Sequence, residues 1–154
     1  MTERPFAPRA LGEIAVRCRD RPSMIAFYGD VLGLKRLEPG ERGGHSDAVV
    51  FFRLGESHGG HVAVLALFDA AQGGAGAEAV NPHDVEAGDR SSLHHLALSL
   101  PWDEQDAAAR WLRERGHGAS VQHFDWTGWR GVFTRDPDGN TVELVAADPE
   151  WHLE

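Results

Sequence analysis

Two stretches in the second half of the chain carry residues that could bind a metal ion. The stretch Leu93 to Leu100 has the character of a β-strand and contains His95, and the stretch Thr141 to Ala146 has the same character and contains Glu143. Imidazole nitrogen and carboxylate oxygen suit Zn²⁺, Ni²⁺, Co²⁺, Mn²⁺ and Fe²⁺, without choosing among them. The sequence therefore predicts a divalent metal site wherever these two strands meet.

The first half of the chain offers equivalent positions, because the two halves share a pattern. An offset of 82 residues pairs Glu13 with His95 (95 − 13 = 82) and His61 with Glu143 (143 − 61 = 82). Sliding the alignment of the last strands by two residues would pair Ala63 with Glu143 instead. Among the four candidate ligands, His61 is therefore the one whose alignment is least certain. The first and last strands of both halves are thus expected to carry a metal-capable residue.

Each candidate ligand also has a purely structural alternative. His94 should point away from His95, because neighbouring residues of a strand face opposite sides. Two inward carboxylates would each be costly to bury without a cation between them, which favours the metal. The alternatives are a core histidine for His95, a solvated strand residue for Glu143, an ion pair with Arg17 or Arg36 for Glu13, and a turn cap for His61.

A tryptophan-rich turn is the other candidate binding feature. Such a turn can form the lip of a binding site, a dimer contact or plain packing. The residues that we assign to substrate binding from this region are His123, Trp126, Trp129 and Arg130.

Both halves show the order strand, helix and three further strands. In the first half, Asp20 should cap a helix that ends at Gly33, and the strand near 35–37 is the least certain. The expected strands of this half are 11–18, 35–37, 48–54 and 61–68. The second half should have strands at 93–100, 118–124, 130–135 and 141–146, and a helix from Asp103 to Arg115 with Ala108, Trp111 and Leu112 on its buried face.

Composition sets limits on the partners. The chain has 154 residues with a formal charge of −9, which disfavours nucleic acid. Its one cysteine suits a reducing compartment, and no apolar run is long enough to span a membrane, so a cytoplasmic location is expected. The segment 70–90, rich in glycine and alanine, is either a linker or a functional loop.

Three stretches make the chain resemble the vicinal oxygen chelate superfamily, which includes glyoxalases, bleomycin-resistance proteins and extradiol dioxygenases. They are Phe27–Leu34, Leu93–Leu98 and Phe133–Leu144. The resemblance implies an α+β fold: two tandem βαβββ modules whose curled mixed sheets enclose one cavity. The implied boundaries are a single domain at 10–147, made of module one (10–70), a linker (71–91) and module two (92–147), with tails at 1–9 and 148–154.

The resemblance also implies a metal site lined by Glu13, His61, His95 and Glu143, in a homodimer. Many relatives have histidine where Glu13 stands. The expected function is a metal-dependent enzyme acting on a small substrate with vicinal oxygens, by lyase, isomerase or ring-cleaving dioxygenase chemistry, with Glu143 or Glu13 as the base. The alternative is a metal-free protein that sequesters a cationic drug, which the acidic charge and five tryptophans would suit.

Overall fold

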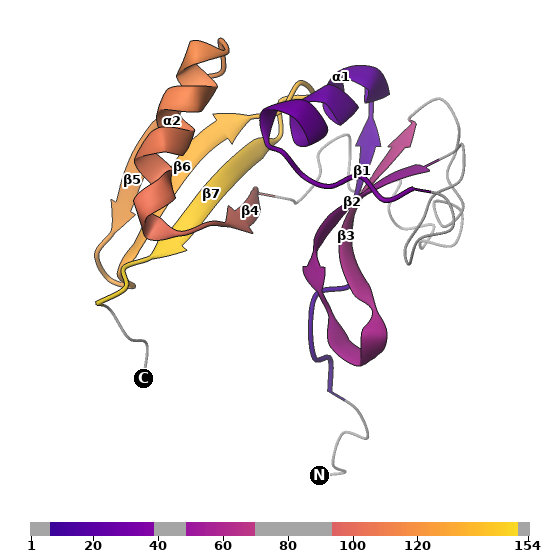
Figure 1. Ribbon diagram of the computed structural model, residues 1–154, viewed down its shortest axis with the longest axis horizontal. Coiled ribbons are helices and arrows are strands. Elements are labelled where there is room, and N and C mark those ends of the chain that lie inside the picture. The colour runs from indigo at the N-terminus through magenta and orange to yellow at the C-terminus, as the bar shows by residue number, and fades with distance from the viewer. Residues whose placement is uncertain (1–6, 39–48, 70–93, 151–154) are drawn as a thin grey trace, which may run out of the picture. The chain divides into compact units, whose positions relative to one another are not determined.

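The computed structural model describes residues 7–38, 49–69 and 94–150. The chain divides into two units, Met1–Ala79 and Val80–Glu154, and each unit contains one sheet and one main helical segment (Figure 1). The predicted linker at 71–91 lies outside the described residues. Within the described ranges, no helix is both long and apolar enough to cross a membrane.

The first unit has a three-stranded mixed sheet. Its strands are β1 (Glu13–Cys18), β2 (Val49–Glu56) and β3 (Val62–Asp69), in the order β1-β3-β2. β1 runs parallel to β3, and β2 runs antiparallel to β3. A parallel pair needs a long crossover connection, which here contains the helix. The strand expected near 35–37 is reduced to a single bridge between Arg36 and Phe52.

The helical segment of this unit begins as α1 (Arg21–Ala26) and continues as a wider turn, η1 (Phe27–Val31). Asp20 caps it as predicted: its carboxylate accepts hydrogen bonds from the Ser23 hydroxyl and backbone N–H, which lower the pKa of Asp20 below its ordinary value of 3.8. Gly33 ends the segment with a φ of +73°. The largest buried side chains here are Met24, Phe27, Tyr28, Phe52, Leu65 and Leu67.

Strand alternation gives the first sheet two different faces. Ile14 and Val16 are half-buried and Cys18 is buried, while Glu13, Ala15 and Arg17 are exposed on the other face. On β3, Leu65 and Leu67 pair with Ile14 and Val16, so they lie on the same face as those residues, and α1 contacts β3. The helix therefore covers one face of the sheet and leaves Glu13 on the opposite face.

The second unit has a four-stranded mixed sheet in the order β4-β7-β6-β5. These strands are β4 (Leu96–Ser99), β5 (Ser120–Phe124), β6 (Trp129–Arg135) and β7 (Thr141–Ala147). Parallel pairing joins β4 to β7, and the other two pairings are antiparallel. The predicted hairpin turn between β6 and β7 is confirmed: the Asp136 carboxylate accepts hydrogen bonds from the backbone N–H groups of Asp138 and Asn140, and Gly139 has a φ of +87°.

The helix of the second unit corrects the predicted buried face. A short turn, η4 (Trp102–Glu104), leads into α2 (Gln105–Glu114), which lies across the sheet strands of its own unit (Figure 1). The buried residues are Gln105, Ala109 and Leu112, at the i, i+4, i+7 spacing of one helical face. Trp111 was wrongly assigned to that face: it is 42% exposed and is covered by the Arg115 guanidinium.

A buried polar contact fixes this helix on the sheet. The Gln105 amide donates hydrogen bonds to the backbone carbonyls of Arg130 (2.6 Å) and Leu144 (3.0 Å). Its carbonyl oxygen accepts from the Arg130 guanidinium, which also donates to the Trp102 carbonyl and stacks on the Trp102 ring. Because Gln105 is fully buried, its amide needs these hydrogen-bond partners to offset the free-energy cost of burying a polar group. Two mixed sheets with few helices confirm the predicted α+β class.

Candidate metal-binding site

The structure brings His95 and Glu143 together. Parallel pairing aligns Ala97 with Glu143, and His95, which directly precedes β4, places its ring beside Glu143 and Phe133, two residues that share one face of the sheet. His95 Nε2 lies 3.0 Å from Glu143 Oε2. The Glu143 side chain is 7% exposed and that of His95 is 32% exposed, so the carboxylate is at the base of the site and the imidazole at its rim.

The separation of these two atoms suits a shared metal ion as well as a direct hydrogen bond. Two ligand atoms that are each about 2.0–2.2 Å from one ion lie about 3–3.5 Å apart at ordinary bond angles. The donor set, one imidazole nitrogen and one carboxylate oxygen, is the mixed set expected from the sequence. In the part of the chain that the structure describes, no group of three or more His, Cys, Asp or Glu residues gathers as a complete metal site.

A glycine in the neighbouring strand makes room for the Glu143 side chain. Two side chains pack closely against Gly131 of β6: a Cβ atom added there would overlap Glu143 Oε1 and would lie 2.8 Å from Phe133 Cε2. Any larger residue at this position would therefore displace the carboxylate. A lone glycine inside a predicted strand often marks such a close approach, so Gly131 within the predicted strand 130–135 is the sequence signal for this contact.

His94 contacts His95 instead of facing away from it, contrary to the expectation. Both residues precede the start of β4 at Leu96, so strand alternation does not apply to them. Their Nδ1 atoms are 2.7 Å apart, so one nitrogen must donate and the other accept. When His95 carries its proton on Nδ1 and donates it to His94, its Nε2 lone pair is available to a cation held between Nε2 and Glu143; a direct hydrogen bond to Glu143 would instead require the proton on Nε2.

Aromatic side chains border the pair on the same face. Phe133 is aligned with Glu143 across the β6–β7 pairing, and its ring lies 6.1 Å from the His95 ring, centre to centre. Phe124 lies 6.2 Å from Phe133 in the same way. The predicted substrate residue Trp129 follows the same alternation as Phe133 and is 41% exposed. Sequence reasoning missed Phe133, because only the register reveals which aromatic residues face the site.

Two of the other predicted substrate residues, His123 and Arg130, do not share this face. Arg130 stays a prediction as a substrate residue, and its guanidinium donates hydrogen bonds to the Gln105 side chain and the Trp102 carbonyl. His123 pairs with Arg130 and follows its alternation, away from Glu143. Trp126 lies in the turn after β5 and is 82% exposed. The turn thus contributes Trp129 to the site face, and Trp126 is an exposed aromatic side chain with no assigned contact.

In the first unit, Glu13 occupies the face that the helix leaves uncovered. Its pairing partner on β3 is Val64, and the same face carries Val62, Ala66 and Phe51. The side chain is exposed, and within the described residues it makes no ion pair with Arg17 or Arg36. The arrangement leaves Glu13 as the metal-capable side chain that β1 and β3 present on this face.

The strand registers correct the alignment of the two halves. If Glu13 corresponds to His95, then Ala15 corresponds to Ala97, and their partners on the last strands are Ala66 and Glu143. The offset there is 77 residues (143 − 66 = 77), not 82. The first unit therefore has Ala66, which carries no ligand atom, where the second has Glu143.

His61 lies on the other side of the first sheet. It precedes Val64 by three residues, so an extended chain turns its side chain away from the face of Val64 and Glu13. A Cβ atom added to Gly12 would lie 3.6 Å from His61 Cε1, and Gly12 faces the side opposite to its neighbour Glu13. Sequence reasoning placed His61 with Glu13 because the β2–β3 hairpin extends further beyond the aligned pair than the β6–β7 hairpin does: 15 residues separate Phe51 from its partner Ala66 (66 − 51 = 15), but 10 separate Phe133 from Glu143 (143 − 133 = 10).

Replacing Gly131 tests how the carboxylate is held. We expect Gly131→Ala to lower the free energy of unfolding by about 1–3 kcal/mol, because the added methyl group crowds Glu143 and Phe133. Gly118→Ala is the matched control, since its added Cβ would meet nothing within 4 Å. Urea unfolding of both variants, and of Gly131→Ala combined with Glu143→Ala, measures the effect. The cost should shrink in the double variant, and equal stabilities for the two alanine variants would contradict this view of Gly131.

Comparisons with known proteins agree with the fold. The model of the Glyoxalase/Bleomycin resistance protein/Dioxygenase superfamily matches residues 10–144. Catechol-2,3-dioxygenase of Bacillus subtilis (strain 168) is 34% identical over 71 residues, which are 45% of this chain and 25% of that protein. The match thus spans about a quarter of that relative's length.

Two solved structures have a similar fold over nearly their full lengths. A glyoxalase/dioxygenase from Nostoc punctiforme has a TM-score of 0.62 and 24% identity, and the match covers 97% of this chain and 100% of that one. Lactoylglutathione lyase from Agrobacterium tumefaciens has a TM-score of 0.59 and 26% identity, covering 92% and 95%. With the sequence match over residues 10–144, these findings show that the chain belongs to the Glyoxalase/Bleomycin resistance protein/Dioxygenase superfamily.

Proposed function

We propose that this protein is a metal-dependent enzyme that acts on a small molecule with two neighbouring oxygen atoms. The observation that carries the proposal is the 3.0 Å contact between His95 Nε2 and Glu143 Oε2 on one face of the second sheet. An isolated buried carboxylate is costly, and a divalent cation shared with the imidazole would offset that cost. Membership of a superfamily that includes enzymes supports the proposal.

His95 and Glu143 are the residues that would hold the metal in the second unit. A bound divalent ion would polarise the substrate oxygens and stabilise negative charge that develops on them. Zn²⁺, Ni²⁺, Co²⁺, Mn²⁺ and Fe²⁺ all accept this donor pair. Glu13 stays a prediction as the ligand from the first unit, and the strand register gives no support to His61.

The chain's own side chains supply the remaining parts of the chemistry. Glu143 has a second oxygen, Oε1, outside the contact with His95, and this oxygen is the candidate proton acceptor. His94 orients the His95 ring through the 2.7 Å contact between their Nδ1 atoms. Phe133 and Phe124 form an apolar border that would exclude water from the reacting atoms.

Two reaction classes follow from the relatives. The similarity to a catechol-2,3-dioxygenase suggests ring cleavage, and the similarity to a lactoylglutathione lyase suggests lyase or isomerase chemistry. Oxygen consumption by the Fe²⁺-loaded protein with catechol would favour the first. Metal-dependent exchange of a carbon-bound proton, without oxygen uptake, would favour the second. The homodimer and the cytoplasmic location stay predictions from the sequence.

Metal binding should depend on the two paired residues. We expect Glu143→Gln and His95→Gln each to weaken Co²⁺ or Zn²⁺ binding by at least about 100-fold, because loss of an outer partner alone commonly costs about 10–100-fold. Isothermal titration calorimetry on chelator-treated protein measures this affinity. His61→Gln is the matched control and should bind as the unaltered chain does, while Glu13→Gln shows whether the first unit contributes a ligand.

Two results would contradict the proposal that His95 and Glu143 bind a metal ion. One is an unaltered chain that binds none of the five ions, as a metal-free drug-binding protein would. The other is equal affinity in the unaltered chain and in the Glu143→Gln and His95→Gln variants, which would place the ion elsewhere.

His94 should matter through the tautomer of His95. We expect His94→Phe to weaken metal binding by about 10–100-fold, because no acceptor then holds the proton on His95 Nδ1. His94→Gln offers a carbonyl oxygen as acceptor and should recover part of the loss. Nitrogen NMR of the imidazoles reports which ring nitrogen is protonated. Unchanged tautomer and affinity in both variants would show that His94 has no positioning role.

A further inference from the structure

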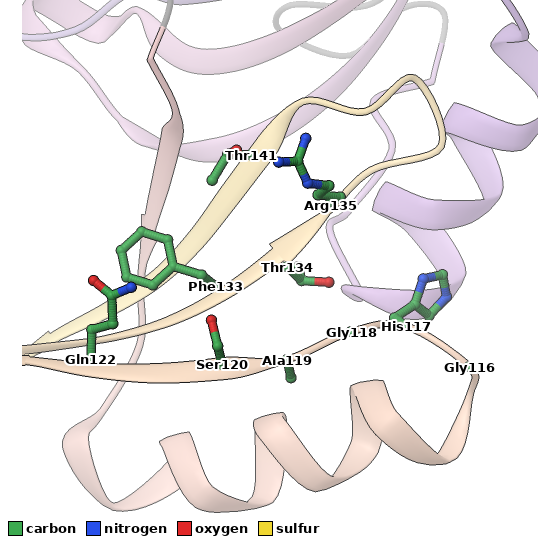
Figure 2. Close-up of a pocket in the computed structure, with 10 residues that line it drawn as sticks. All are labelled: Gly116, His117, Gly118, Ala119, Ser120, Gln122, Phe133, Thr134, Arg135 and Thr141. Carbon is green, nitrogen blue, oxygen red and sulfur yellow. The ribbon is translucent and has the colours of Figure 1, made fainter.

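A cavity of about 620 Å³ lies in the second unit, next to the His95 and Glu143 pair but distinct in its chemistry. It extends over the ends of β5, β6 and β7 and the loop 116–119 that follows α2 (Figure 2). Phe133 belongs to both places, since it lines the cavity and its ring contacts that of His95. The side chains used below are Ser120, Gln122, Phe133, Thr134, Arg135 and Thr141.

The strand registers place most of these side chains on the face of Glu143. Arg135 is aligned with Thr141 and Phe133 with Ser120, so they share the alternation that carries Glu143. Figure 2 shows Ser120, Gln122 and Phe133 on the side of the strands away from helix α2. A ligand on the Phe133 ring would thus lie over the same sheet face as the metal pair.

The cavity is cationic, although the chain is acidic. Its described lining residues include Arg135 and no Asp or Glu. The Arg135 Nη1 atom donates to the Gly139 carbonyl at 3.1 Å, and its remaining guanidinium N–H groups have no hydrogen-bond partner in the described part of the chain. A planar guanidinium with spare donors matches a carboxylate, which can accept two parallel hydrogen bonds.

A buried hydroxyl in the cavity wall also lacks a partner. Thr134 is 5% exposed, and its Oγ1 atom has no hydrogen bond within the described residues. A buried polar atom of this kind is rare in folded proteins and costs free energy until a partner reaches it. Because Thr134 lies between Phe133 and Arg135 in β6, its side chain faces the α2 side of the sheet, so it borders the cavity from the other face and is not assigned to a ligand on the Phe133 ring.

We propose that this cavity binds a small aromatic carboxylate, with the carboxylate at Arg135 and the ring against Phe133. The Phe133 ring supplies the apolar contact, and Ser120, Gln122 and Thr141 supply further hydrogen-bonding groups. Such a ligand, anchored at Arg135, extends along Phe133 toward His95. As a statement about the substrate class, the proposal rests on the proposed function. Binding of the carboxylate to the cavity itself requires no metal.

The test compares three ring compounds of nearly equal shape on the full chain after chelator treatment. Benzoate is the probe, benzamide is its neutral counterpart, and benzamidine is the cationic one. We expect benzoate to bind at least about 10-fold more tightly than either, because charge-assisted hydrogen bonds are the stronger ones. Amide NMR shifts should gather at 116–122 and 133–141. Phenyl phosphate, as a further arm, distinguishes a carboxylate site from a general anion site.

Substitutions link the preference to the cavity. Arg135→Gln should bring the affinity for benzoate down to that for benzamide, and Arg115→Gln is the control, because Arg115 stacks on Trp111 outside the cavity. Glu143→Gln should leave benzoate binding intact, so loss of the metal proposal and loss of this one are distinguishable.

Four outcomes would overturn the proposal. If benzoate binds no more tightly than benzamide or benzamidine, the cavity has no preference for an anion. Undiminished benzoate binding in Arg135→Gln, or NMR shifts that gather outside the cavity, places the anion elsewhere. Tighter binding of phenyl phosphate than of benzoate replaces the carboxylate by a phosphate ester. Because the comparison of three probes uses the unaltered chain, it stands even if a variant fails to fold.

Discussion

The candidate site depends on one constraint: Glu143 places a carboxylate on the face of a sheet, where it is nearly inaccessible to water. Such a group needs a partner, and the parallel pairing of β4 with β7 supplies His95 at 3.0 Å. The position also needs space, which Gly131 provides on the neighbouring strand. Three strands thus share in holding one side chain, and the helix α2 leaves this face uncovered.

The two units use the same architecture with unequal chemistry. Each has a helix on one face of its sheet and a candidate ligand at the start of its first strand, Glu13 or His95. The last strand of the second unit adds Glu143, whereas that of the first has Ala66 and apolar neighbours. On the faces opposite the helices, the second unit therefore contributes two potential ligand side chains and the first contributes one, from the strands compared here.

Periodicity and turn chemistry were enough to predict most elements. Asp20, Gly33 and the turn at 136–140 mark element ends by their own conformational preferences, so they could be recognised without tertiary information. The pairing of His95 with Glu143 was also within reach, because both lie on strongly alternating strands of one half. The buried face of α2 was less accessible, because Gln105, a polar residue, occupies it and Trp111 does not.

The errors share a physical cause, which is that sequence offset does not fix strand register. His61 was paired with Glu143 by counting residues, but the β2–β3 hairpin has longer strands than the β6–β7 hairpin and contains a bulge between Arg53 and Gly55. One residue of slip moves a side chain to the other face, and this separates His61 from Glu13. The same limit hid Phe133, because only the register of β6 with β7 aligns it with Glu143.

The most direct measurement of the central claim is a crystal structure of the metal-loaded protein, with diffraction recorded on both sides of the metal absorption edge. The account predicts one anomalous peak about 2.0–2.2 Å from both His95 Nε2 and Glu143 Oε2. A peak at other side chains, with the His95 and Glu143 contact unchanged beside it, would contradict the account.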